Sequence, residues 1–465
     1  MALQRYSSRD EFGNLLAPAP DPGPWPAPVA AGPLNARISL PGSKSLTNRE
    51  LVLSALASGP SLLRRPLHSR DAQLMIDGLR ALEIRIDEQP GSGEYGPDLL
   101  ITPAELTGGR MIDCGLAGTV MRFLPPVAAL ALGPVQFDGD EGARRRPMRT
   151  MIAALRGLGV DINDDGRGTL PFGLWGTGSV VGGELEIDAS ASSQFVSGLL
   201  LSAPRFENGL VLRHTGERLP SLPHIEMTIA CLAARGVVVD TPEPGVWVVA
   251  PQPIAGLDVD IEPDLSNAAP FLIAAIVAGG EVTIDGWPRA TTQVGAELEK
   301  LLPLFGATVR RDGDGMVVDG GVGIRGGGHI PGVELDLSTA GELAPAIVAL
   351  AALADTPSRI VGIGHLRGHE TDRLAALAAE IVKLGGAVTE LDDGLAISPQ
   401  PLHGGVWQSY ADHRMATAGA IIGLAVAEVD IDDIATTSKT LPQFPALWLS
   451  ATGTIGATAA PHELS

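Results

Sequence analysis

Two stretches, ISLPGSKSLTNRELVLSALA (residues 38–57) and ELDLSTAGELAPAIVALAAL (residues 334–353), share the pattern that decides the fold. In each, a short apolar strand leads through a turn of small polar residues into a long helix rich in Ala, Leu and Val. A helix that is apolar all round is typical of a buried element, so both helices are expected inside a core. Four further stretches have the same pattern and begin at Met111, Glu186, Asp260 and Ser409.

The spacing of the six stretches indicates an internal repeat. Gly42 and Gly115 occupy like positions 73 residues apart, and Asp188 and Asp336 lie 148 residues apart, which is twice 74. Each Ala-rich helix is followed by a β-branched strand, an amphipathic helix and a further strand pair, so each unit is predicted as βαβαββ. Six units are too many for one core. We therefore predict an α/β (α+β) chain with two domains, each with three units around buried helices.

Composition excludes several classes of function. The 465 residues are 45% hydrophobic and 19% charged, with a net charge of −21, which disfavours a general nucleic-acid binder or a protein held on anionic lipid. The longest apolar stretch, residues 123–135, is too short for a membrane helix and contains three prolines. No secretory signal is recognised, and Cys114 and Cys231 cannot form a disulfide framework. We expect a cytoplasmic protein, in which the Pro/Ala-rich residues 1–32 form a flexible leader outside both domains.

The turns before the six Ala-rich helices point to an anion site. Each turn opens a helix N-terminus, where free N–H groups and the macrodipole favour negative charge. Lys44 and Lys439 both lie among hydroxyl residues, which suits phosphate or carboxylate binding. Ordinary capping explains the Ser, Thr and Asp residues but not the recurrent arginines. The polar side chains at or near these turns are Lys44, Ser45, Arg49, Thr119, Arg122, Ser192, Ser193, Gln194, Glu342, Asp412, His413 and Arg414.

Eight motifs in order resemble the 5-enolpyruvylshikimate-3-phosphate synthase family, the 3-phosphoshikimate 1-carboxyvinyltransferases. The resemblance runs from about Ile38 to Leu447 and implies the two-domain enolpyruvyl transferase fold. It places the first domain at residues 42–262 and the second at residues 33–41 and 264–460. The motifs are PGSKSLTNR (41–49), LAGTVMR (116–122), GDEGARRRP (139–147), DASASSQF (188–195), LPSLPHI (219–225), LRGHETDR (366–373), ADHRMA (411–416) and TSKTLPQF (437–444).

The resemblance implies transfer of the carboxyvinyl group of phosphoenolpyruvate to the 5-hydroxyl of shikimate 3-phosphate, with release of phosphate, in the shikimate pathway. It implies no cofactor or metal, inhibition by glyphosate in the donor site, and a monomer that uses neither nucleic acid nor membrane. It assigns shikimate 3-phosphate to Lys44, Ser45, Arg49, Ser192, Ser193, Gln194, Ser221, Glu342 and His369. Phosphoenolpyruvate is assigned to Lys44, Gly118, Arg146, Gln194, Arg373, Arg414 and Lys439.

Three residues are predicted as catalytic, because one hydroxyl proton must leave and another must reach the vinyl methylene. Glu342 matches the family's proton acceptor, although an acidic residue on the first turn of a helix also suits the dipole without any catalytic role. Glu370 and Lys44 are expected in the proton steps at the methylene carbon.

The sequence departs from the commonest family pattern at His369, His224 and Leu116, where many members have Lys, Tyr and Asn. We expect the His369 imidazole to change charge with pH near the substrate. His365, His369 and Glu370 could alternatively suggest a metal site, but no third ligand of metal type is evident and this reading is disfavoured.

Two rival functions remain open at this point. The related transferase that acts on UDP-N-acetylglucosamine shares the fold, but its family normally carries a catalytic cysteine, and residues 138–149 contain none. A non-catalytic anion-binding protein on the same fold would need the cations but not the carboxylates Glu342 and Glu370.

Overall fold

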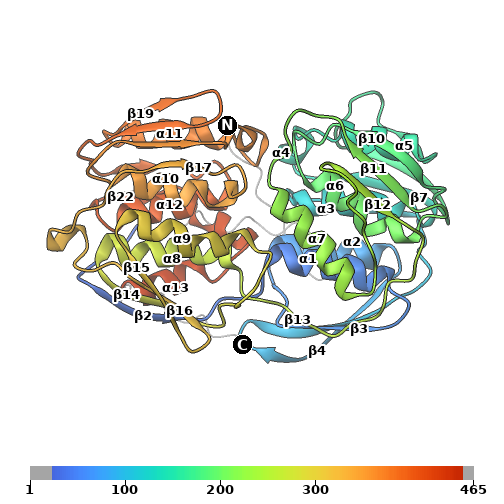
Figure 1. Ribbon diagram of the computed structural model, residues 1–465, viewed down its shortest axis with the longest axis horizontal. Coiled ribbons are helices and arrows are strands. Elements are labelled where there is room, and N and C mark those ends of the chain that lie inside the picture. The colour runs from blue at the N-terminus through green and yellow to red at the C-terminus, as the bar shows by residue number, and fades with distance from the viewer. Residues whose placement is uncertain (1–22, 454–465) are drawn as a thin grey trace.

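The computed structural model describes residues 23–453, which form two halves lying side by side (Figure 1). Each half has its own hydrophobic core. The core of the first half is built from residues between Leu51 and Ile254. The core of the second half is built from residues between Leu265 and Ala451, together with residues between Ala27 and Leu40. The fold class predicted from the repeat is confirmed: the chain has a mixed α/β architecture in two parts.

All six Ala-rich stretches form helices at the centres of the halves. Every residue of α3, α8 and α10 is buried, as expected for helices without a polar face. In the first half α3 packs against α6, and in the second half α10 packs against α12. The six helices are α1 (Lys44–Leu56), α3 (Gly118–Ala128), α6 (Gln194–Ser202), α8 (Leu265–Ala278), α10 (Ala344–Ala352) and α12 (His413–Gly423).

A second helix follows in each unit, and five of the six are regular. These are α2 (Arg70–Ala81), α5 (Arg149–Gly157), α7 (Leu222–Ala234), α11 (Arg373–Lys383) and α13 (Phe444–Ala451). The fourth unit instead has η2 (Val294–Glu297), α9 (Leu298–Leu301) and η3 (Leu302–Phe305), and Pro303 lies in the first turn of η3. Short turns complete the helices: α4 (Glu141–Arg144), η1 (Ala203–Arg205), η4 (Ile324–Gly326), η5 (Gly341–Leu343), η6 (Gly364–Gly368) and η7 (Ile434–Lys439).

Six small sheets surround the helices, three in each half, and each contains one parallel strand pair. In the first half the orders are β13 (Val259–Asp260), β3 (Ser61–Arg64), β5 (Gly96–Thr102), β4 (Arg85–Gly93); β6 (Arg110–Asp113), β7 (Leu132–Asp138), β9 (Phe172–Thr177), β8 (Asp161–Asn163); and β10 (Gly183–Ile187), β11 (Leu210–His214), β12 (Val246–Val249). In the second half they are β15 (Thr308–Asp312), β16 (Gly315–Asp319), β14 (Gly280–Ile284), β2 (Leu34–Ile38); β17 (Glu334–Asp336), β18 (Ser358–Val361), β20 (Leu395–Ser398), β19 (Ala387–Glu390); and β1 (Trp25–Pro26), β22 (Val429–Ile431), β21 (Gly405–Trp407).

The halves exchange strands at two adjacent crossovers. Strand β2 precedes α1 but pairs with β14 in the second half, whereas β13 precedes α8 but pairs with β3 in the first half. The two crossing segments are hydrogen-bonded to each other, because Ser43 N donates to Glu262 O at 2.7 Å and Asp264 N donates to Pro41 O at 3.0 Å. These bonds hold the start of α1 beside the start of α8.

The prediction that residues 1–32 form a leader outside both domains is wrong for its last part. Trp25 and Pro26 form β1, which pairs antiparallel with β22, and Ala27 and Ala30 are buried in the second core. In the other five sheets this place beside the parallel pair is filled by a strand that follows the second helix. In the sixth sheet β1 covers that edge instead. The predicted leader residues 1–22 lie outside the described part.

The third unit also departs from βαβαββ. It has the single strand β12 where a strand pair was predicted, with an isolated bridge between Asp240 and Val248. Along residues 23–453, no helix combines the length and hydropathy that crossing a bilayer requires.

Candidate active site

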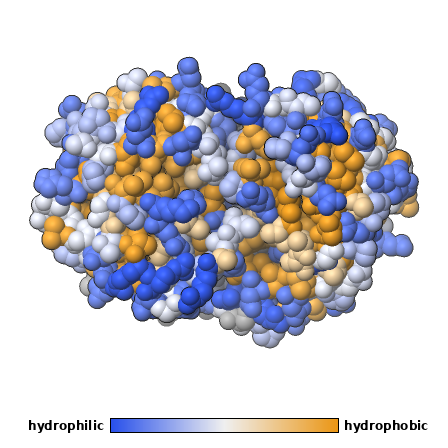
Figure 2. Space-filling view, in the orientation of Figure 1, coloured by the Kyte–Doolittle hydropathy of each residue, from blue (hydrophilic) through white to orange (hydrophobic). Residues whose placement is uncertain are grey.

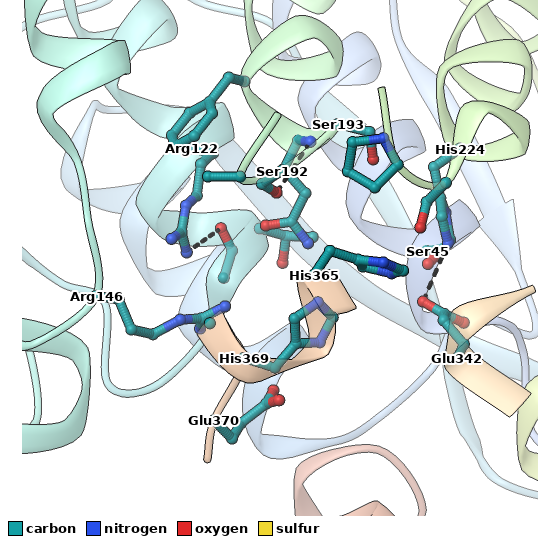
Figure 3. Close-up of a pocket in the computed structure, with 18 of the residues that line it drawn as sticks. Ser45, Arg122, Arg146, Ser192, Ser193, His224, Glu342, His365, His369 and Glu370 are labelled. Carbon is teal, nitrogen blue, oxygen red and sulfur yellow. Dashed lines mark hydrogen bonds and ion pairs between the residues drawn. The ribbon is translucent and has the colours of Figure 1, made fainter. Parts of the chain in front are cut away.

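A cavity of about 280 Å³ lies where the two halves meet, and helix starts from both halves line it (Figure 3). Residues of the first turns of α1, α3, α6 and α12 face it, as does the short turn η5 in front of α10. The sixth helix start, that of α8, does not line this cavity, although its Ser266 reaches Glu342. The prediction of an anion site at the starts of six helices is therefore corrected for α8, which does not face this cavity.

The structure brings nearly all predicted site residues to this cavity. Lys439 does not line it but lies beside it, 5% exposed, with its Nζ bonded to Glu370. The other predicted residues line the cavity: Lys44, Ser45, Arg49, Gly118, Arg146, Ser192, Ser193, Gln194, Ser221, Glu342, His369, Glu370, Arg373 and Arg414.

The lining is electrostatically positive although the protein is acidic. Six cationic side chains face the cavity, against the three carboxylates of Asp71, Glu342 and Glu370. A cavity with this surplus of cations in a partly desolvated setting suits a ligand with several negative charges. The six cations are Lys44, Arg49, Arg122, Arg146, Arg373 and Arg414.

Among the cavity arginines of the first half, Arg122 and Arg146 have no carboxylate within ion-pair distance in residues 23–453 and few other acceptors. Arg122 is 2% exposed, and it donates to Gly118 O and Pro147 O at 3.4 Å. Burial and the nearby Arg146 lower the pKa of Arg122 well below its usual value. Arg146 donates from Nη1 to Leu116 O at 3.3 Å, and its Nε lacks a protein acceptor in the described part. An anionic ligand would relieve the cost of keeping both cations here.

Arg49 is more fully engaged by the protein than the sequence suggested. Its Nε donates to Thr228 Oγ1 at 2.8 Å, its Nη1 to Ser45 O at 2.9 Å, and its Nη2 to His224 O at 2.8 Å. A weaker bond of 3.5 Å joins Nη2 to Ser197 Oγ. A guanidinium has five N–H donors, so these bonds leave one donor of Nη1 for a ligand.

The second half contributes a closed network of ion pairs. Arg373 donates to both oxygens of Asp412, at 2.7 and 3.1 Å, and to Glu370 Oε2 at 2.8 Å. The other oxygen of Glu370 is bonded to Lys439, whose Nζ also donates to Leu116 O at 3.2 Å. Lys439 and Arg373 hold the pKa of Glu370 well below its usual value despite burial. Glu370 is therefore ionised in the resting site.

Glu342 receives hydrogen bonds from three elements. Its Oε2 accepts from Ser266 Oγ at 2.9 Å and from Arg414 Nη2 at 3.2 Å, and its Oε1 lies 3.1 Å from His224 Nε2. Burial opposes ionisation, but His224, Arg414 and Lys44 outweigh it and lower the pKa of Glu342 well below its usual value. A partly buried, ionised carboxylate at a cavity wall can accept a proton from a bound hydroxyl.

Gly118 is the first residue of α3 and lines the cavity beside Gln194 and Arg146. A Cβ at this position would lie 2.9 Å from Gln194 Oε1 and 3.1 Å from Arg146 Nη2. Glycine therefore lets the amide and the guanidinium lie over the start of α3 without being displaced.

Three of the four predicted serines, Ser192, Ser193 and Ser221, reach the cavity just before α6 and α7. Ser192 Oγ accepts from Gln194 N at 3.2 Å, and Ser193 is 5% exposed. Ser221 adopts a left-handed backbone, with φ of 54°, and its N donates to Ser338 O in the second half at 3.3 Å. The hydroxyls thus form a neutral wall of donors beside the arginines.

The histidine behaviour expected from the sequence is wrong for His369. Burial and the nearby Arg373 lower its pKa well below the usual value, and Arg373 Nη1 donates to its Nδ1 at 3.2 Å. His369 is therefore neutral near pH 7 and does not change charge with pH there. Burial also lowers the pKa of His365, to about 4. In the described residues, no three side chains of metal-ligand type lie close enough together to hold an ion.

The sequence reasoning missed several cavity residues. Asp71 lies on the second helix of its unit, outside the turns that the repeat highlighted, and contacts Lys44 Nζ at 3.6 Å. Arg122 and His413 were recognised near the turns but were not assigned to the site, although both line it. His224 was noted only as a departure from the family pattern. Leu116, the third departure, contributes through its backbone, because its carbonyl accepts hydrogen bonds from Arg146 and Lys439.

The two cysteines lie in the first core rather than at the cavity. Burial raises the pKa of both Cys114 and Cys231 above the usual value, which keeps the thiols protonated. Neither thiol can serve as the catalytic cysteine of the rival transferase.

Solved structures of enolpyruvyl transferases have the same fold. An EPSP synthase from Acinetobacter baumannii superposes with a TM-score of 0.73 at 22% identity, covering 92% of this chain and 97% of that one. The enolpyruvyl transferase NikO from Streptomyces tendae gives a TM-score of 0.69 at 16% identity, covering 91% of this chain and 96% of that one. At these identities the likeness defines the fold class.

Sequence comparison assigns the family within that class. The family model for EPSP synthase (3-phosphoshikimate 1-carboxyvinyltransferase) matches residues 29–448, and the chain belongs to this family. A relative from Kocuria rhizophila named 3-phosphoshikimate 1-carboxyvinyltransferase is 56% identical over 438 residues, which cover 93% of this chain and 97% of the relative. The chain is thus an enzyme of the shikimate pathway that transfers the enolpyruvyl group of phosphoenolpyruvate to shikimate 3-phosphate.

Proposed function

We propose that the cavity binds both substrates at once, with each half holding mainly one of them. Shikimate 3-phosphate lies against the first half, where Ser192, Ser193 and Ser221 bind its phosphate side. Lys44, Ser45, Arg49 and Gln194 bind it beside them, with His369 and Glu342 facing it from the second half. The observation that carries this proposal is the surplus of cations over carboxylates in one cavity shared by both halves.

Phosphoenolpyruvate lies between the two arginine groups. Arg146 and Gly118 face it from the first half, and Arg373, Arg414 and Lys439 from the second, with Lys44 and Gln194 between the two substrates. The planar guanidinium fork matches both carboxylate and phosphate oxygens. The uncompensated Arg122 and Arg146 support this placement, because a dianion neutralises them.

The proton steps use Glu342, Lys44 and Glu370. Glu342 accepts the proton of the 5-hydroxyl as that oxygen attacks the donor, and the Lys44 ammonium delivers a proton to the methylene carbon. When phosphate leaves, ionised Glu370 accepts one proton of the new methyl group, which restores the double bond. The lowered pKa values of Glu342 and Glu370 support their roles as acceptors, because both are ionised before the reaction.

The division into a first domain, residues 42–262, and a second domain, residues 33–41 and 264–460, is part of the same proposal. Strand β1 is now added to the second domain. Two separate cores and the paired crossovers support it. We also propose a cytoplasmic monomer. Both cysteines are free thiols, as suits a reducing compartment.

Phosphate release tests the proposed substrate pair. Purified protein should release phosphate from phosphoenolpyruvate with shikimate 3-phosphate, and not with UDP-N-acetylglucosamine. Release with the nucleotide sugar alone would overturn the substrate assignment. Binding of both substrates by calorimetry without any release would favour the non-catalytic anion-binding alternative.

A further inference from the structure

One side chain of the first half reaches across the cleft to a catalytic candidate of the second. His224 is the third residue of α7, and its N donates to Ser221 O at 3.0 Å. Its ring is 12% exposed and its Nε2 lies 3.1 Å from Glu342 Oε1. Figure 3 shows this contact as the dashed line that joins His224 and Glu342 at one end of the cavity.

The backbone of His224 is fixed from its own half. Its carbonyl accepts from Arg49 Nη2 at 2.8 Å and from Thr228 Oγ1 at 3.0 Å. Arg49 in turn is 1% exposed. The ring is therefore carried by a rigid part of the first half, and its reach toward Glu342 depends on how the halves are placed.

The contact completes the set of donors around Glu342. Ser266 and Arg414 donate to Oε2, while His224 faces Oε1. An ionised carboxylate only accepts, so Nε2 carries the proton in this pair. Ser266 and Arg414 belong to the second half, and among the described residues His224 is the donor from the first half. The other titratable groups close by are Lys44 on α1, Asp264 before α8 and His365 in η6.

We propose that His224 is a positioning residue, which orients the Glu342 carboxylate from across the cleft and brings it into working geometry only when the halves meet. The inference rests on the proposed role of Glu342 as the proton acceptor. A glutamate carboxylate turns about three side-chain bonds, and donors on one oxygen alone leave part of that freedom. A third donor from the opposite wall removes it, and its loss leaves the base less often aligned with the hydroxyl.

The test compares kcat and KM in a set of variants. His224→Leu should lower kcat about tenfold and change KM for phosphoenolpyruvate less than twofold, because the proposed donor-binding residues Arg146, Arg373 and Arg414 stay in place. His224→Gln, which keeps an N–H donor of similar reach, should recover most of the loss. His329→Leu is the matched control, because it removes an exposed histidine–carboxylate contact, to Asp355 at 3.2 Å, and should leave both constants unchanged.

A double-mutant cycle separates this inference from the function on which it rests. In a Glu342→Gln background, His224→Leu should cause no further loss in kcat, since the group that it positions is gone. Equal losses in both backgrounds, or unchanged kcat in the single variant, would overturn the positioning role. Unchanged turnover in Glu342→Gln would instead overturn the assignment of the base. If His224→Leu does not fold, His224→Asn takes its place, because its amide ends short of Glu342.

Discussion

The two halves differ in how the cations that they bring to the cavity are neutralised. In the first half, the cations Arg122 and Arg146 have no carboxylate partner among the described residues. In the second, Glu370, Arg373 and Lys439 neutralise one another, with Asp412 behind them. The first half is therefore completed by a bound anion, whereas the second is complete without one. A change in the first half should weaken binding, and a change in the second should also weaken the fold.

The largest expected effect is on the second-half base. Glu342→Gln keeps the shape of the side chain and its contact with Arg414 but removes the proton acceptor. Turnover should fall by about a hundredfold or more. Calorimetry should still detect shikimate 3-phosphate, with affinity close to that of the unchanged protein. Turnover near the original level would show that another group takes the proton.

Glu370→Gln should sharpen the contrast, because it acts on activity and stability together. The change leaves Arg373 and Lys439 with Asp412 as the one nearby carboxylate of their network. We expect a loss of about 3 kcal/mol in the free energy of unfolding, measured in urea, as for other broken buried pairs. Turnover should fall as well. A normal unfolding midpoint would contradict the view that the second half neutralises itself.

Arg122→Met is the matching change in the first half. It removes a buried cation that lacks an ion-pair partner in residues 23–453, and it fills the space with an apolar chain. KM for phosphoenolpyruvate should rise about tenfold, as expected when a charged contact to an anion is lost. The free energy of unfolding without ligand should stay the same or increase. A marked loss of stability would break the comparison between the halves.

Gly118→Ala should have a smaller effect on substrate binding. The new methyl group meets Gln194 and Arg146, which must shift by a few tenths of an ångström. Glyphosate should lose affinity more than phosphoenolpyruvate, because it is the bulkier occupant of the donor site. Inhibition curves for both proteins provide the measurement. Equal inhibition would place Gly118 away from the donor.

The smallest effect is on the pH dependence of stability without ligand. The pKa values of Glu342 and Glu370 are lowered in the folded protein, so their contribution is present above the usual carboxyl range. It is lost as pH falls below about 4.5 toward the folded pKa values. Urea unfolding between pH 7 and 3 should show this decline. The decline should be shallower when both residues are replaced by Gln.

The repeated pattern predicted the fold well because burial of a helix that is apolar all round follows from its own residues. The helix starts likewise predicted most of the cavity, since Lys44 begins α1, and Ser192 and Glu342 lie just before α6 and α10. Asp71 and the contact of His224 with Glu342 could not be read in this way. The first depends on how α2 packs against the start of α1, and the second on how α7 packs against η5. The neutral state of His369 depends on the burial and the arginine that only the folded site provides.

Strand β1 escaped the sequence analysis for a different reason. Two residues, one of them a proline, carry no strand pattern, and what places them is the open edge of β22. That pairing joins residues separated by about four hundred positions. During synthesis on the ribosome, residues 25–38 therefore emerge early but must wait for β14 and then β22 before they can pair. The first half is a continuous stretch of chain that ends with the two-residue strand β13, so it can fold early. The second half is completed last, when Trp25 and Pro26 pair with β22.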